Sequence, residues 1–145
     1  MEEKRLLLFR ALFRTQGKLA RLSKFNLEGK LSGAEYGIIR NLGEQALTLS
    51  ELSQRMLRVN SNTTAMVDHL ETKGLVKREP DPNDRRVIRV SLTETGMKLR
   101  EEVIPKQERF IQELLAPLTD FEATALTALL EKVEKICDDT SNPKR

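Results

Sequence analysis

Residues 60–93 read NSNTTAMVDHLETKGLVKREPDPNDRRVIRVSLT, and the spacing of apolar residues changes within this stretch. Before Gly74, apolar residues recur every three or four positions, which predicts a helix that starts at an Asn60 or Ser61 N-cap. Gly74 itself stands where a helix end favours a left-handed residue. After Gly74 the spacing becomes two, and a proline-containing turn at residues 80–84 separates two runs of strand-forming residues. The stretch therefore predicts a helix followed by a β-hairpin. The predicted inner face of the helix carries Thr63, Met66, Val67 and Leu70, and the predicted strands are residues 75–79 and 86–92.

Helix-start signals flank this stretch on both sides. A Ser or Thr followed three residues later by Glu can satisfy two free amides at a helix N-terminus reciprocally. We predict capping boxes of this pattern beginning at Ser32, Thr48 and Thr119, and Thr93 is a further predicted cap. We expect the polar tail from Asp138 onward to fray. The predicted helices are residues 4–25, 33–41, a short one from residue 49, 94–115 and 120–137.

Composition excludes several classes of protein. The chain has 145 residues, 39% of them hydrophobic and 32% charged, which predicts one globular domain over residues 1–145. One Cys and one His cannot build a disulfide framework or a His/Cys metal cluster, and no glycine-rich phosphate loop occurs. We therefore expect no enzyme, no cofactor and no metal site. No apolar run approaches the ~20 residues that cross a membrane, so we expect a cytoplasmic protein with no membrane partner.

A short helix joined by a few residues to a second helix is typical of a helix-turn-helix, and a basic hairpin after it makes the winged version. The second helix of this motif enters the DNA major groove, and an arginine at the hairpin tip suits a narrow minor groove. Asp84 can orient the Arg86 guanidinium for that role. The candidate DNA-binding residues are Arg58, Asn60, Ser61, Asn62, Thr64, Ala65 and His69 around the helix, and Lys77, Asp84, Arg85 and Arg86 on the hairpin. A purely structural interpretation stays open, in which residues 60–64 only cap the helix and Asp84–Arg86 is an ordinary surface pair.

Residues 70–76 and 84–96 resemble the corresponding segments of MarR-family transcriptional regulators. The family pattern reads Leu-Glu-x-x-Gly-Leu-Val/Ile, followed by Asp-x-Arg and then Val-x-Leu-Thr-x-x-Gly. This chain matches the second part at Asp84, Arg86, Val90, Leu92, Thr93 and Gly96. The resemblance implies a mainly α fold with a small β-hairpin wing, in a triangular homodimer that binds pseudo-palindromic double-stranded DNA, usually as a repressor. Many such proteins are released by small phenolic or other lipophilic ligands.

Two departures from the family pattern affect what the resemblance implies. Many relatives carry a basic residue where this chain has Ala65, so base recognition would depend more on Asn62, Thr64 and the wing. Relatives that sense peroxide often have a reactive cysteine in the first helix, and residues 1–30 contain none.

The terminal helices predict a dimer independently of the resemblance. The apolar surface on these helices is larger than the surface needed to cover a winged lobe of residues 31–92. Exposed apolar stripes of this kind usually mark a partner surface. We therefore expect residues 1–30 and 93–145 to form dimerisation helices. A monomer that folds these helices back onto the lobe is the alternative. The stripes are residues 8–22, 103–115 and 126–137.

Cys137 and His69 are the single cysteine and the single histidine of the chain, and each has a functional and a structural interpretation. We expect Cys137, on the apolar side of the last helix, to be a buried structural thiol. An exposed Cys137 would instead favour a redox-responsive regulator. We expect His69 to contact phosphate or the groove, or simply to be exposed, rather than to bind a metal. A further alternative is a winged-helix module that binds proteins and not DNA.

Overall fold

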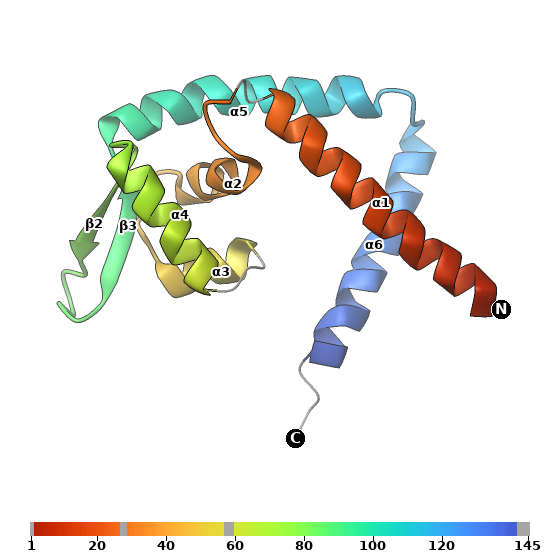
Figure 1. Ribbon diagram of the computed structural model, residues 1–145, viewed down its shortest axis with the longest axis horizontal. Coiled ribbons are helices and arrows are strands. Elements are labelled where there is room, and N and C mark those ends of the chain that lie inside the picture. The colour runs from red at the N-terminus through yellow and green to blue at the C-terminus, as the bar shows by residue number, and fades with distance from the viewer. Residues whose placement is uncertain (1, 27–28, 57–59, 142–145) are drawn as a thin grey trace. The chain divides into compact units, whose positions relative to one another are not determined.

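The computed structural model describes residues 2–26, 29–56 and 60–141 (Figure 1). They form two compact units, residues 1–108 and 109–145. None of the described helices is both long enough and apolar enough to span a membrane. The elements are α1 (Glu2–Asn26), α2 (Gly33–Leu42), β1 (Leu47–Thr48), α3 (Leu49–Met56), α4 (Asn60–Thr72), β2 (Val76–Pro80), β3 (Ile88–Leu92), α5 (Glu94–Leu115) and α6 (Asp120–Ser141).

All three predicted capping boxes are present. In the box that starts α2, the Glu35 amide donates to Ser32 Oγ at 3.2 Å, and the Ser32 amide donates to Glu35 Oε2 at 2.8 Å. The same reciprocal pair of hydrogen bonds forms at the starts of α3 and α6. A helix N-cap of this type stabilises its helix by about 0.5–2 kcal/mol, so the boundaries of these helices are set by local sequence. The two further pairs are Thr48–Glu51 and Thr119–Glu122.

The hairpin is part of a three-stranded antiparallel sheet with the order β1-β3-β2. The predicted pairing of β2 with β3 is confirmed, although β3 begins at Ile88 because the Val87 amide still donates into the turn, to Asp84 O at 3.0 Å. The third strand, β1, was missed. It has two residues, and a run this short carries no detectable periodicity. Its pairing places Leu47 opposite Val90, so the hairpin is joined directly to the segment that precedes α3.

The core lies between α2, α3, α4 and the sheet. On α4 the predicted inner face is confirmed, because Thr63, Val67 and Leu70 are fully buried and Met66 is partly buried. The C-terminal end of α4 is also as predicted. Gly74 has φ +70°, and the Leu75 amide donates back to Leu70 O at 3.0 Å. A residue with a Cβ would be strained in this left-handed conformation.

Two predicted helix ends were wrong. α4 includes Asn60 and Ser61, so these residues belong to its first turn and do not precede it as the N-cap. α6 continues to Ser141, so residues 138–141 belong to the helix rather than to a frayed tail. The reason is that no helix-breaking residue occurs before Pro143, and the Thr140 hydroxyl donates to Ile136 O at 2.7 Å inside the last turn.

Apolar side chains remain exposed on the terminal helices of the single chain. In α6, all of which is described, no residue is buried, and Phe121 and Leu129 are 81% and 62% exposed. In α1, the rings of Phe9 and Phe13 contact each other at a tilt, with their centroids 4.7 Å apart, and both side chains are also exposed. Cys137 is exposed, so the prediction that it is buried is wrong for the single chain.

Candidate nucleic-acid interface

The candidate residues on α4 lie on the face opposite its buried side chains. Asn62, Ala65 and His69 are exposed, whereas Thr64 is half-buried. The side chains of Asn60 and Ser61, and the whole of Arg58, lie outside the described residues. The described part of this face therefore presents a polar Asn62 and a small Ala65 in the first half of the helix.

His69 is joined to a buried carboxylate. Its Nδ1 lies 2.6 Å from Oε1 of Glu35, whose side chain is only 6% exposed. Lys73 Nζ donates to the same oxygen at 3.0 Å. Burial raises the pKa of the Glu35 carboxyl. The hydrogen bonds from the Ser32 amide, Lys73 and His69 lower it by more than burial raises it, so the net pKa lies below 4.5. The end of α4 is thereby attached to the start of α2, a contact that sequence reasoning missed.

Both basic residues of β2 are paired within the protein. Arg78 donates to Asp68 and to Glu71, both on α4, at 2.5 Å each. Burial lowers the pKa of Arg78, but the two carboxylates more than compensate and the net pKa is raised. The neighbouring Lys77 donates to Glu79 at 2.7 Å. Arg78 therefore connects the hairpin to α4 rather than facing outward.

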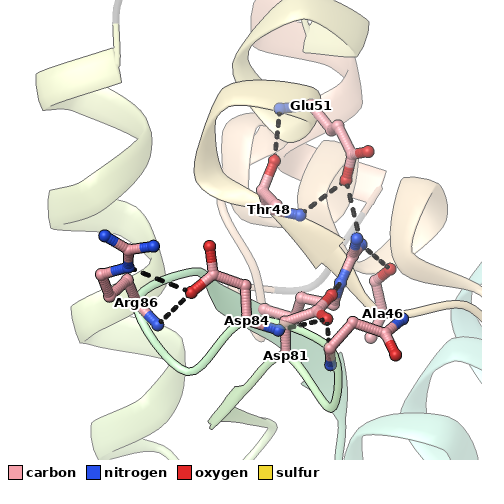
Figure 2. A network of polar contacts seen from close by, with 8 residues as sticks. Ala46, Thr48, Glu51, Asp81, Asp84 and Arg86 are labelled. Carbon is pink, nitrogen blue, oxygen red and sulfur yellow. Dashed lines mark hydrogen bonds and ion pairs between the residues drawn. The ribbon is translucent and has the colours of Figure 1, made fainter.

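The hairpin tip presents Arg86 to solvent. Its side chain is 92% exposed, and its Nε lies 3.3 Å from Asp84 Oδ1. The same carboxylate oxygen accepts the Arg86 backbone amide at 3.0 Å, as Figure 2 shows. The predicted pairing of Asp84 with Arg86 is confirmed. Asp84 thus holds the base of the Arg86 side chain, and the exposed Arg85 stands next to it.

Behind the tip lies a second network that the sequence did not reveal. Arg89 donates through Nε to the Asp81 carboxylate and through Nη1 to Ala46 O at 3.3 Å and Glu51 Oε2 at 3.4 Å. The available signal was Asp81 between two prolines, because Asp in a turn commonly accepts hydrogen bonds from amides two or three residues ahead. It does so here, from Asn83 at 2.8 Å and Asp84 at 3.3 Å.

Comparison with known proteins identifies what this arrangement resembles. The family model described as "MarR family" matches residues 31–88. The chain is 30% identical over 137 residues to the HTH-type transcriptional regulator MhqR of Bacillus subtilis, and the match covers 92% of this chain and 93% of that one. Other relatives match over a shorter stretch, and the part shared with YsmB of the same organism spans 60% of that protein.

Solved structures agree along nearly the whole chain. A cysteine-to-serine mutant of Escherichia coli MarR in complex with operator DNA is 29% identical, with a TM-score of 0.82 over 90% of this chain and 95% of that one. Bordetella bronchiseptica BpsR, in a structure on the regulation of its DNA binding by 6-hydroxynicotinic acid, is 25% identical with a TM-score of 0.80, covering 86% of this chain and 91% of that one.

Proposed function

The chain belongs to the MarR family of transcriptional regulators, and from this premise we propose that it is a homodimeric repressor released from its operator by a small molecule. Membership of the family makes the protein a DNA-binding transcriptional regulator and not an enzyme. The proposed operator is a pseudo-palindromic site in double-stranded DNA, read in the cytoplasm.

One observation carries the DNA-binding part of the proposal. The outward arginine at the hairpin tip, Arg86, is held by Asp84, while Arg78 joins the same hairpin to α4. In this proposal the start of α4 enters the major groove and Arg86 enters the adjacent minor groove. Asn62 and Thr64 would contact base edges, and backbone amides at the start of α4 would contact phosphate. The other proposed DNA-binding residues are Arg58, Asn60, Ser61, Ala65, His69, Lys77 and Arg85.

The exposed apolar side chains of α1 and α6 support the homodimer. Their exposure in the single chain would be costly in water, and a second copy can cover such surfaces symmetrically. Residues 1–30 and 93–145 are the proposed dimerisation helices, and residues 31–92 form the proposed DNA-binding lobe. A two-fold dimer would separate its two copies of α4, the helices proposed to enter the major groove, by one DNA turn, ~34–36 Å.

A relative supports control by a ligand. The DNA binding of BpsR is described as regulated by 6-hydroxynicotinic acid, a small aromatic acid. For this chain we propose a small phenolic or lipophilic effector. A second candidate is control by oxidation, favoured by the exposed thiol of Cys137. Loss of DNA binding on treatment with peroxide, prevented in Cys137→Ser, would support that alternative.

Selection of duplexes from random-sequence DNA tests the proposal directly. We expect an enriched inverted repeat with half-sites separated by about 10–10.5 bp. Sedimentation equilibrium should give the mass of two chains, and repeating the selection with a panel of phenolic acids should identify the effector. No enrichment at low salt would favour the protein-interaction module, and the mass of one chain would contradict the dimer.

A further inference from the structure

Arg89 lies on the middle strand of the sheet, where it can reach both neighbouring strands. The register places it opposite Thr48 of β1 on one side and opposite Glu79 of β2 on the other. Its side chain is 32% exposed, far less than that of Arg86 at the tip. Its position therefore differs from that of an arginine directed toward solvent.

The guanidinium of Arg89 connects the wing loop to the start of α3. On the loop side it binds Asp81, whose carboxylate also accepts the amides of Asn83 and Asp84. On the other side it binds Ala46 O and Glu51 Oε2, and Glu51 is the capping-box carboxylate of α3. Figure 2 shows these contacts around Asp81, Ala46 and Glu51.

The contacts continue to Arg86 at the tip of the wing. The amide of Asp84 donates to Asp81, and the carboxylate of Asp84 accepts from Arg86. At the other end of this series of contacts, α3 is bonded to α4, because the buried Ser53 hydroxyl donates to the buried Thr63 hydroxyl at 2.9 Å. A series of polar contacts thus links Arg86 to α3, and α3 is bonded in turn to α4.

We propose that Arg89 is a positioning residue that fixes where the wing presents Arg86 relative to the helix-turn-helix, without contacting DNA itself. This inference rests on the proposed DNA-binding function. A wing loop that is ordered before binding loses less conformational entropy in the complex, so the same Arg86 contact stabilises the complex more. Asp81 is the loop-side partner through which Arg89 acts.

A double-mutant cycle on a duplex selected by the wild-type protein tests the proposal. We expect Arg89→Gln to weaken binding about tenfold, which corresponds to the ordering cost of one or two side chains. In an Arg86→Ala background, the same substitution should weaken binding less than about twofold, because the contact that Arg89 positions is already gone. Asp81→Asn should behave like Arg89→Gln. Arg89→Lys should lose less affinity for the duplex than Arg89→Gln, since lysine keeps the positive charge.

The salt dependence distinguishes positioning from direct contact. If Arg89 touches phosphate, adding Arg89→Gln to Arg86→Ala should lower the slope of log K against log salt by a further ~0.9, whereas positioning leaves the slope of the double variant equal to that of Arg86→Ala. Lys98→Gln, on the exposed surface of α5, removes the same charge and is the control.

Each outcome has a separate meaning. Equal losses from Arg89→Gln in both backgrounds, or no loss in either, would overturn the positioning role. A wild-type protein that selects no duplex would instead overturn the proposed function. Thermal unfolding of each variant shows whether the lobe stays folded, and if Arg89→Gln does not fold, Asp81→Asn and Arg89→Lys complete the same cycle.

Discussion

Gly96 packs directly against the carbonyl oxygen of Leu75. A Cβ added at Gly96 would lie 1.9 Å from that oxygen, well inside contact distance. The same carbonyl accepts the Thr93 amide at 3.1 Å, and the Thr93 hydroxyl caps α5 by accepting the Gly96 amide at 3.0 Å. The glycine of the Leu-Thr-x-x-Gly segment is therefore required by close backbone packing between the start of α5 and the residue that follows Gly74.

Gly96→Ala should destabilise the protein by about 1–3 kcal/mol or more, because the backbone around Leu75 must move to admit the methyl group. The matched control is Gly17→Ala in α1, where no atom of the single chain lies within 4 Å of the added Cβ. That substitution should stabilise the helix by about 0.5–1 kcal/mol. Thermal unfolding of both variants checks the prediction, which equal effects at the two sites would contradict.

The buried hydroxyl pair of Ser53 and Thr63 should show strong coupling. Thr63→Val removes the acceptor of the Ser53 hydroxyl and should cost about 1–3 kcal/mol, since a buried donor loses its partner. Adding Ser53→Ala to that variant should recover part of the loss, because no unpaired Ser53 donor remains. Urea unfolding of the two single variants and the double variant measures the coupling. Strictly additive losses would show that the hydroxyl pair contributes nothing as a pair.

The acid stability of the lobe should depend on Glu35. Burial raises its pKa, but the Ser32 amide, Lys73 and His69 lower it below 4.5 in the folded protein. A carboxyl with a lower pKa when folded stabilises the protein above its unfolded pKa, and this contribution disappears as the pH falls through the folded value. The free energy of unfolding should therefore fall more steeply below about pH 4.5 in the wild type than in Glu35→Gln. The control is Glu101→Gln, which removes an exposed carboxyl on α5. The same decrease in the free energy of unfolding at acid pH in the wild type and in Glu35→Gln would refute the prediction.

Arg86→Ala should weaken binding to every duplex by a similar factor. Loss of one phosphate or minor-groove contact should reduce the slope of log K against log salt by ~0.9. Titrations at several salt concentrations measure both effects, with Lys98→Ala as a variant of equal charge change on α5. A slope unchanged from that of the wild type would place Arg86 outside the interface.

Asn62→Ala leaves the charge of the protein unaltered and should change its preference for particular bases. An Asn on the exposed face of α4 can bind one adenine edge in a bidentate manner, so its loss should relax selection at one position in each half-site by about 1–3 kcal/mol. Repeating the random-sequence selection with the variant shows which position is affected. Retention of the full wild-type consensus would assign base recognition to other residues.

Local patterns in the sequence predicted much of the fold. The three Ser/Thr-x-x-Glu boxes, the inner face of α4 and the turn at Gly74 depend on residues within a few positions of one another, so spacing alone identifies them. The pairing of Asp84 with Arg86 belongs to the same group. The strand β1 was not predictable in this way, because its two residues become a strand only where β3 lies beside them.

The sequence by itself determined the helices, the hairpin and the pair of acidic and basic residues at its tip, since each is stabilised by neighbours in the chain. Only the tertiary structure decided which basic side chains remain directed outward. Arg78, Arg86 and Arg89 carry the same type of charge, but folding brings carboxylates of α4, α3 and the wing loop within hydrogen-bonding distance of Arg78 and Arg89. These two arginines therefore hold the hairpin in place. The sequence alone does not reveal this, because the carboxylate nearest in space can belong to a residue that is distant in sequence.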